Sequence, residues 1–169
     1  MVKQHLAERL PGVEMKLNLA AEYMVVKGFE DRAATRADEL LCHPDGSILI
    51  EQSYFYESPN LEQAVFELCM AGKKPILAHP ERYLYMAGQW ERFDKLVEMG
   101  CRLQMNLMSL SGTYGPASMK ILHHLLDHGM YSFCATDLHT VPQLHKILSL
   151  EIDRKMMEKV REVQRNGIG

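Results

Sequence analysis

The chain has 169 residues, of which 47% are hydrophobic and 24% charged, and its formal net charge is −3. These totals suit one globular domain and exclude the strongly basic surface typical of nucleic-acid binding. No apolar run approaches the ~20 residues that cross a bilayer, and the first residues lack the apolar segment of a secretory signal. The four cysteines form no C-x-x-C pair, which favours reduced thiols. We therefore expect a cytoplasmic protein with no nucleic-acid partner and no membrane insertion.

Strand-like and helix-like runs alternate along the chain. Strands are predicted at residues 14–24, 46–55, 74–80 and 101–107, and at 130–140, where the strand runs into a loop. Helices are predicted at 60–72, 89–100 and 116–129, each ending at a glycine, with Asn60 as a candidate N-cap. A short charged segment follows the first strand, and a C-terminal helix is predicted at about 151–166. We expect a single domain over residues 1–169.

Polar side chains recur near the strand ends at intervals of 29, 28, 27 and 31 residues. In a (β/α) barrel all strands end on one face, whereas a doubly wound sheet brings together only the strands at its switch point. The regular spacing therefore favours a barrel. At this spacing 169 residues make roughly six units, fewer than the usual eight, so one or two units are expected to be missing. The polar residues are Glu22, Glu51, His79, Asn106 and Asp137.

Carboxylates and imidazoles at one barrel mouth predict a metal site. Such oxygen and nitrogen donors suit Mn²⁺, Fe or Zn²⁺, while the lack of thiolates argues against structural zinc. More than three of these ligands suggests more than one ion, because clustered carboxylates repel unless cations neutralise them. Paired ions clamp the oxygens of a phosphoryl displacement, and Arg82 offers a planar fork to phosphate. The candidate ligands are Glu22, Glu51, His79, Asp137 and His139.

Each candidate also has a purely structural interpretation. A strand-end glutamate is commonly solvated, His79 could be satisfied by backbone in a turn, Asp137 could cap a helix, and Arg82 could be a surface cation. Tyr83 could line a pocket for an aromatic substrate or be a half-buried strand-end aromatic. Ser111 lies in the loop 109–115, which could bind phosphate through backbone N–H groups or serve as a connector. The shared spacing is what favours a site.

Several segments resemble, in order and spacing, the bacterial capsular-polysaccharide-type protein-tyrosine phosphatases of the polymerase-and-histidinol-phosphatase (PHP) superfamily. The pairing of AHPERY with a later Q-x-N-x-x-S-L-x-G pattern is fairly specific to this branch. The similarity runs from about Leu17 to about Thr140. The matching segments are AAEYM, ILIEQSYFYESPN, PILAHPERYLY, LQMNLMSLSGTYG and CATDLHT.

The resemblance implies a distorted (β/α)₇ barrel whose trinuclear centre, usually Mn²⁺-dependent, hydrolyses phosphotyrosine with a metal-bound hydroxide. It implies that Glu22 bridges two ions, that Glu51 and His79 bind the second, that Asp137 binds the first and His139 the third. By the same analogy the partner is a phosphotyrosine protein, a bacterial tyrosine kinase that controls polysaccharide export. A homo-oligomer is compatible with the sequence.

Arg82 resembles the family arginine that orients phosphate and stabilises charge in the transition state. Together with Tyr83 and Ser111 it completes the expected substrate contacts. The family's opening H-x-H strand, acidic DDG loop and ATPH-like stretch are absent, so we expect fewer ions here than the family's two to three. Two alternatives remain open: a catalytically incomplete module for binding or assembly, and a small-molecule phosphoesterase similar to histidinol phosphatase.

Overall fold

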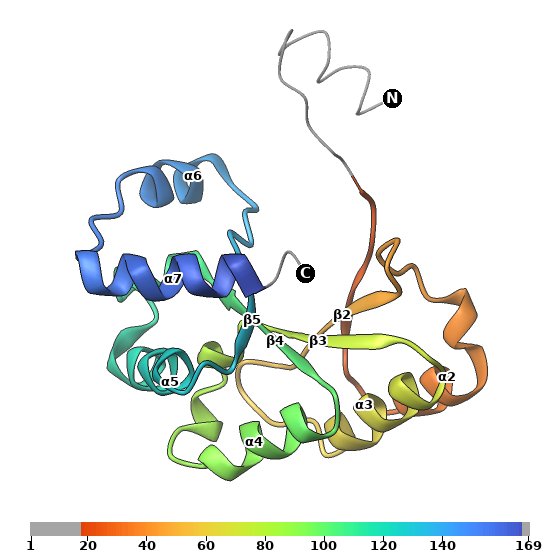
Figure 1. The fold of residues 1–169 in the computed structure, drawn as a ribbon. Helices are drawn as coiled ribbons and strands as arrows, with labels where there is room; N and C mark the ends of the chain where they lie inside the picture. The colour runs from red at the N-terminus through yellow and green to blue at the C-terminus, as the bar shows by residue number, and fades with distance from the viewer. Residues whose placement is uncertain (1–17, 167–169) are drawn as a thin grey trace, which may run out of the picture.

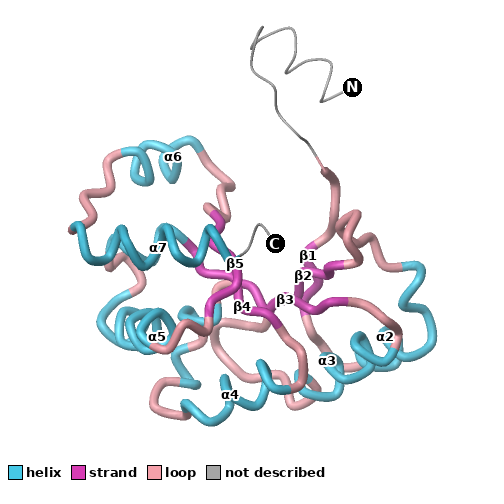
Figure 2. The backbone as a smooth tube through the Cα atoms, viewed as in Figure 1, coloured by secondary structure: helices cyan, strands magenta, loops and turns pink. Residues whose placement is uncertain are grey.

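The computed structural model describes residues 18–166, and five parallel strands form one sheet in it (Figures 1 and 2). Their spatial order is the sequential one, β1-β2-β3-β4-β5. The strands are β1 (Glu22–Met24), β2 (Ser47–Glu51), β3 (Lys74–Ala78), β4 (Arg102–Asn106) and β5 (Tyr131–Ala135). The α-helices are α2 (Phe29–Arg36), α3 (Leu61–Met70), α4 (Trp90–Glu98), α5 (Gly115–Asp127), α6 (Val141–Leu148) and α7 (Arg154–Asn166).

Each connection between neighbouring strands passes through one of the helices α2 to α5, which lie along one side of the sheet (Figure 1). Sequential parallel strands joined in this way are the arrangement of a (β/α) barrel. The α/β fold of barrel type is therefore confirmed. Within residues 18–166 the sheet stays open, because β1 and β5 are its edges. Among these residues no helix combines the length and apolar character needed to cross a membrane.

Alternation along the strands separates a core face from an inner face. Ile48 and Ile50 of β2 and Leu77 of β3 are fully buried beneath the helices. The register pairs Glu22 with Leu49, which alternates with those isoleucines, so Glu22 lies on the inner face. Glu51, two residues after Leu49, shares that face. Helical residues of the core include Ala64, Leu68, Phe93, Leu96, Ile121 and Leu125.

The structure corrects several predicted elements. Within the described residues the first strand is only β1, so Glu22 begins that strand rather than ending it; residues 14–17 lie outside the described part. The segment after it, expected to be short and charged, forms helix α2, which buries only Phe29 and Ala33. Asn60 does not cap α3, because its amide donates to Glu30 Oε1 at 2.6 Å. The predicted C-terminal helix is confirmed as α7, beginning at Arg154.

A buried carboxyl group ties the turn after β3 to the rest of the sheet. Glu81 lies in the 3₁₀ turn Pro80–Arg82 and has no exposed surface. Its side chain accepts hydrogen bonds from the Asn106 backbone N–H at 2.9 Å, the Ser109 hydroxyl at 2.6 Å and the Tyr131 hydroxyl at 2.8 Å. Burial raises the pKa of Glu81, while the hydrogen bonds from Ser109 and Asn106 oppose that rise. The turn is thus anchored to β4 and β5.

We expect Glu81→Ala to lower the free energy of unfolding by about 3 kcal/mol, because it leaves buried donors without an acceptor. Urea unfolding measures the change. Glu62→Ala on α3 is the matched control, since its carboxylate makes only an exposed ion pair with Lys95, of the kind worth roughly 0–1 kcal/mol. Equal stabilities of the two variants would show that the Glu81 network does not hold the fold.

Candidate active site

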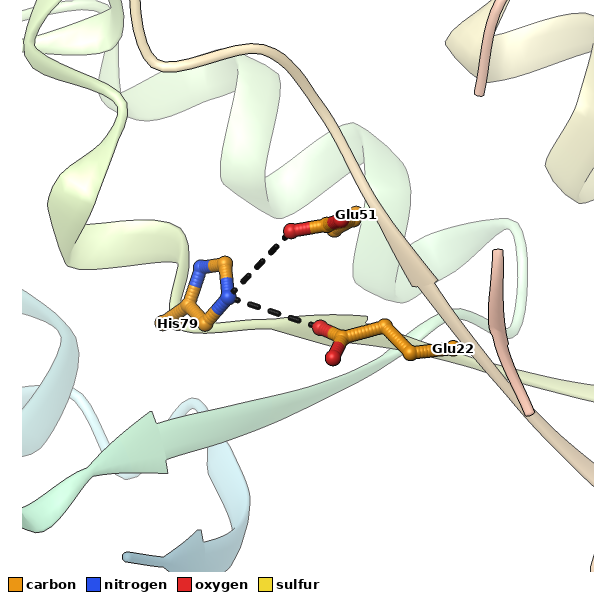
Figure 3. Close-up of side chains that lie close together, drawn as sticks. All are labelled: Glu22, Glu51 and His79. Atoms are coloured by element: carbon orange, nitrogen blue, oxygen red, sulfur yellow. Dashed lines mark ion pairs between the residues drawn. The ribbon is translucent and has the colours of Figure 1, made fainter. Parts of the chain in front are cut away.

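Three side chains from neighbouring strands converge at one end of the sheet (Figure 3). His79 Nε2 lies 3.5 Å from Glu22 Oε1 and 3.7 Å from Glu51 Oε2. One donor atom of each residue lies within 4.8 Å of the other two. Glu51 ends β2, and His79 directly follows β3. The structure therefore brings together three of the five predicted ligands.

The backbone of His79 makes this meeting possible. Leu77 points into the core, so strict alternation would place His79 on the core face, away from both glutamates. Instead His79 adopts a left-handed conformation, with φ 35° and ψ 53°. That conformation costs about 1–2 kcal/mol for a residue with a Cβ atom. In the described residues only His79 and Asp137 combine positive φ with a side chain, and both lie at the candidate site.

The cluster of Glu22, Glu51 and His79 fits a divalent cation. Metal–ligand distances of about 2.0–2.2 Å put two donors on one ion roughly 3–3.5 Å apart, close to the separations seen here. Burial raises the pKa of Glu51, and the charge of Glu22 raises it further. A bound cation reverses both effects by favouring the charged carboxylates. The imidazole and carboxylate donors suit Mn²⁺, Fe or Zn²⁺.

Asp137 and His139 lie apart from this cluster. Asp137 Oδ2 accepts hydrogen bonds from Arg82 Nη1 at 3.2 Å and from the Asn106 amide at 3.1 Å. The side chain of His139 is 67% exposed, and its Nδ1 lies 2.9 Å from the carbonyl oxygen of Asp137. The roles of Asp137 and His139 as metal ligands stay predictions, and the geometry assigns Asp137 a further part in orienting Arg82.

The guanidinium group of Arg82 is held between two aromatic rings. Its central carbon lies 4.1 Å from the Tyr54 ring centroid and 4.4 Å from that of Tyr114. The Tyr54 hydroxyl in turn lies 3.4 Å from His79 Nε2. Burial raises the pKa of Tyr54 to about 12, so its phenol is neutral at physiological pH. The sequence marks the loop 109–115 as a candidate for phosphate binding but gives no signal for the Tyr114 side chain, because its contact with Arg82 arises only in the tertiary fold.

Tyr83 lies beneath the site, where its ring centroid is 5.8 Å from that of His79 and 6.2 Å from that of Tyr54, and its predicted role in substrate binding stays a prediction. It is fully buried, and its hydroxyl donates to the Ala78 carbonyl at 3.0 Å and accepts from the Gln52 N–H at 3.0 Å. It therefore joins β3 to the segment after β2. Ser111 is half-buried and donates to the Met108 carbonyl at 2.7 Å. Its predicted contact with substrate stays a prediction.

A family described as "Capsular polysaccharide synthesis, CpsB/CapC" matches residues 2–165 of the chain. The chain belongs to this family. Tyrosine-protein phosphatase YwqE of Bacillus subtilis is 31% identical over 94 residues, which cover 56% of this chain and 37% of YwqE. Tyrosine-protein phosphatase CpsB of Streptococcus agalactiae is 29% identical over 98 residues, covering 55% of this chain and 40% of CpsB. The aligned part thus spans about two fifths of these relatives.

The fold also matches a solved structure from work on YwqE of Bacillus subtilis and CpsB of Streptococcus pneumoniae, which describes both as unique metal-dependent tyrosine phosphatases. The TM-score is 0.68 with 25% sequence identity, over 98% of this chain and 70% of the solved one. The similarity covers all five strands, β1 to β5. It agrees with the barrel-type architecture expected for the family.

We expect Tyr83→Phe to lower the free energy of unfolding by about 1–2 kcal/mol, because it removes a buried hydroxyl that bridges two backbone groups. Urea unfolding measures the loss. Tyr56→Phe is the control, since Tyr56 is 67% exposed. If Tyr83→Phe kept full stability but weakened the binding of a phosphate ester, the hydroxyl of Tyr83 would serve substrate binding rather than the fold.

Proposed function

We propose that this CpsB/CapC family member carries the metal- and phosphate-binding site of a metal-dependent phosphatase acting on phosphotyrosine in proteins. The observation that carries the proposal is the meeting of Glu22, Glu51 and His79 beside the clamped guanidinium of Arg82. Family membership and the names of YwqE and CpsB support the same activity.

In this proposal Glu22, Glu51 and His79 hold one divalent ion, with Mn²⁺ as the favoured metal. When bound, the ion supplies a Lewis acid that polarises a phosphoryl oxygen and lowers the pKa of water. Arg82 donates N–H groups to phosphate oxygens as charge develops on them. Asp137 orients the guanidinium by accepting a hydrogen bond from one of its five N–H groups.

We further propose that the substrate protein is a phosphorylated bacterial tyrosine kinase and that the reaction takes place in the cytoplasm. Support for the first point comes from the family's description as one of capsular polysaccharide synthesis. The four cysteines, none of which is disulfide-bonded in the structure, support the second.

A catalytically incomplete binding module is the second candidate function. Its support is that the described residues gather only three donors into one metal-compatible group, with Asp137 and His139 outside it. Such a module would bind about one ion per chain without turning over a phosphate ester. Metal content and turnover, measured on the same preparation, separate the two functions.

We expect the 169-residue protein to bind Mn²⁺, and His79→Ala and Glu51→Gln each to weaken that binding more than tenfold. Even partners outside the coordination sphere are worth roughly 10–100-fold in metal affinity. Isothermal titration with Mn²⁺ measures the affinity, and elemental analysis the stoichiometry. His123→Ala, at an exposed position, and Glu62→Gln, at a half-buried position, are controls because neither residue belongs to the cluster. Unchanged affinity in both site variants would refute the metal cluster, and two or three ions per chain would refute the incomplete module.

We expect Arg82→Lys to lower kcat/KM for a phosphotyrosine peptide by about 10²-fold in the presence of Mn²⁺, because lysine lacks the planar fork that matches phosphate oxygens. Initial rates of phosphate release measure the loss. Arg36→Lys, at an exposed position of α2, is the control. Full activity of Arg82→Lys would remove Arg82 from the mechanism, and absent turnover in a metal-loaded wild type would favour the binding module.

A further inference from the structure

A cavity of about 350 Å³ opens beside the candidate active site. The residues that line it are Tyr54, Phe55, Arg82, Leu84 and Tyr114. Four of them are aromatic or aliphatic, and Arg82 supplies the only charge. Tyr54 also borders the cluster shown in Figure 3, since its hydroxyl lies 3.4 Å from His79 Nε2, and the Arg82 guanidinium packs on the Tyr54 ring. The cavity is therefore an extension of the candidate site.

The rim of the cavity exposes large apolar side chains. Phe55 is 90% exposed and Leu84 44% exposed. They come from different segments, Phe55 from the loop after β2 and Leu84 from the 3₁₀ turn Leu84–Met86 after β3. Apolar groups from separate segments that flank a hollow mark a binding site, because leaving them in water forfeits burial energy. A volume of this size is in the range of small-ligand pockets, roughly 300–1,000 Å³.

The clamp on Arg82 limits how a ligand can reach it. Tyr54 and Tyr114 cover the two faces of the guanidinium, so only its N–H edge is left for an anion. Within residues 18–166, the hydrogen-bond partner of that edge is Asp137, which accepts from Arg82 Nη1. The remaining N–H donors are available to a phosphate. The organic group attached to such a phosphate has the adjoining cavity open to it.

We propose that this cavity, which we name the aryl pocket (Tyr54, Phe55, Leu84 and Tyr114 around Arg82), receives the aromatic ring of a phosphate monoester and so selects aryl over alkyl phosphates. The proposal rests on the proposed function and adds the residues that determine its specificity. The ring packs on Phe55 and Leu84 and contacts the edges of the two tyrosines. The single methylene of phosphoserine is too small to make these contacts, so phosphoserine gains nothing from the pocket.

Binding of non-hydrolysable analogues to the 169-residue protein tests the pocket separately from turnover. Benzylphosphonate mimics phenyl phosphate with a methylene in place of the ester oxygen, and ethylphosphonate carries a methyl group in place of the ring. In calorimetric titrations with Mn²⁺ present, we expect benzylphosphonate to bind the wild type about tenfold more tightly, as one aromatic contact provides. The double variant Phe55→Ala/Leu84→Ala should reduce this ratio to about one and leave ethylphosphonate affinity unchanged.

Phe66→Ala on α3 is the control, because Phe66 is an exposed phenylalanine that does not line the pocket. This variant should keep the tenfold ratio between the two phosphonates. Urea unfolding of each variant checks the fold. Equal binding of the two phosphonates to the wild type would overturn the aryl pocket and leave the phosphate site standing. A tenfold ratio that survives in the double variant would place the ring elsewhere. Failure of both phosphonates to bind would overturn the pocket together with the proposed function.

Discussion

The candidate site depends on a carboxyl group that never meets solvent. Glu81 sits between His79 and Arg82 in one tight turn, and its hydrogen bonds reach β4, the following 3₁₀ turn and β5. A buried carboxyl with these donors can adopt few other positions, because each lost hydrogen bond leaves a desolvated group behind. The turn is therefore held from within the core. The imidazole and the guanidinium on either side of it gain fixed positions as a consequence.

The rigid turn helps to hold side-chain and backbone arrangements that would be unfavourable in an unfolded chain. Glu22 and Glu51 place two carboxylates near each other on the inner face, and burial with mutual repulsion raises the pKa of Glu51. His79 and Asp137 both hold left-handed backbone conformations. Local strain and like charges persist in native proteins where the surrounding structure enforces them, and they cluster at functional sites. A cation bound among the donors would relieve the repulsion without altering the backbone.

The sequence predicted the periodic features well and the individual contacts less well. The near-constant spacing of polar residues near the strand ends predicted a parallel sheet with its strands in sequential order. Three of those residues, Glu22, Glu51 and His79, do lie close together. Helix α2 was missed because it buries only Phe29 and Ala33, too few apolar residues to show a helical period. The burial of Tyr83 beneath the site could not be predicted, because a tyrosine beside a site and a tyrosine beneath it look alike in sequence. Glu81 is fully buried, which no pattern in the sequence indicates.

By itself the sequence determined the order of the strands, the donor types available and the family to which the chain belongs, because these follow from local periodicity and residue identity. Only the tertiary structure decided which donors share a cluster. It separated Asp137 and His139 from Glu22, Glu51 and His79, and it brought Tyr114 onto Arg82. These outcomes depend on strand register and on backbone turns at single residues, where a change of one position sends a side chain to the opposite face of the sheet.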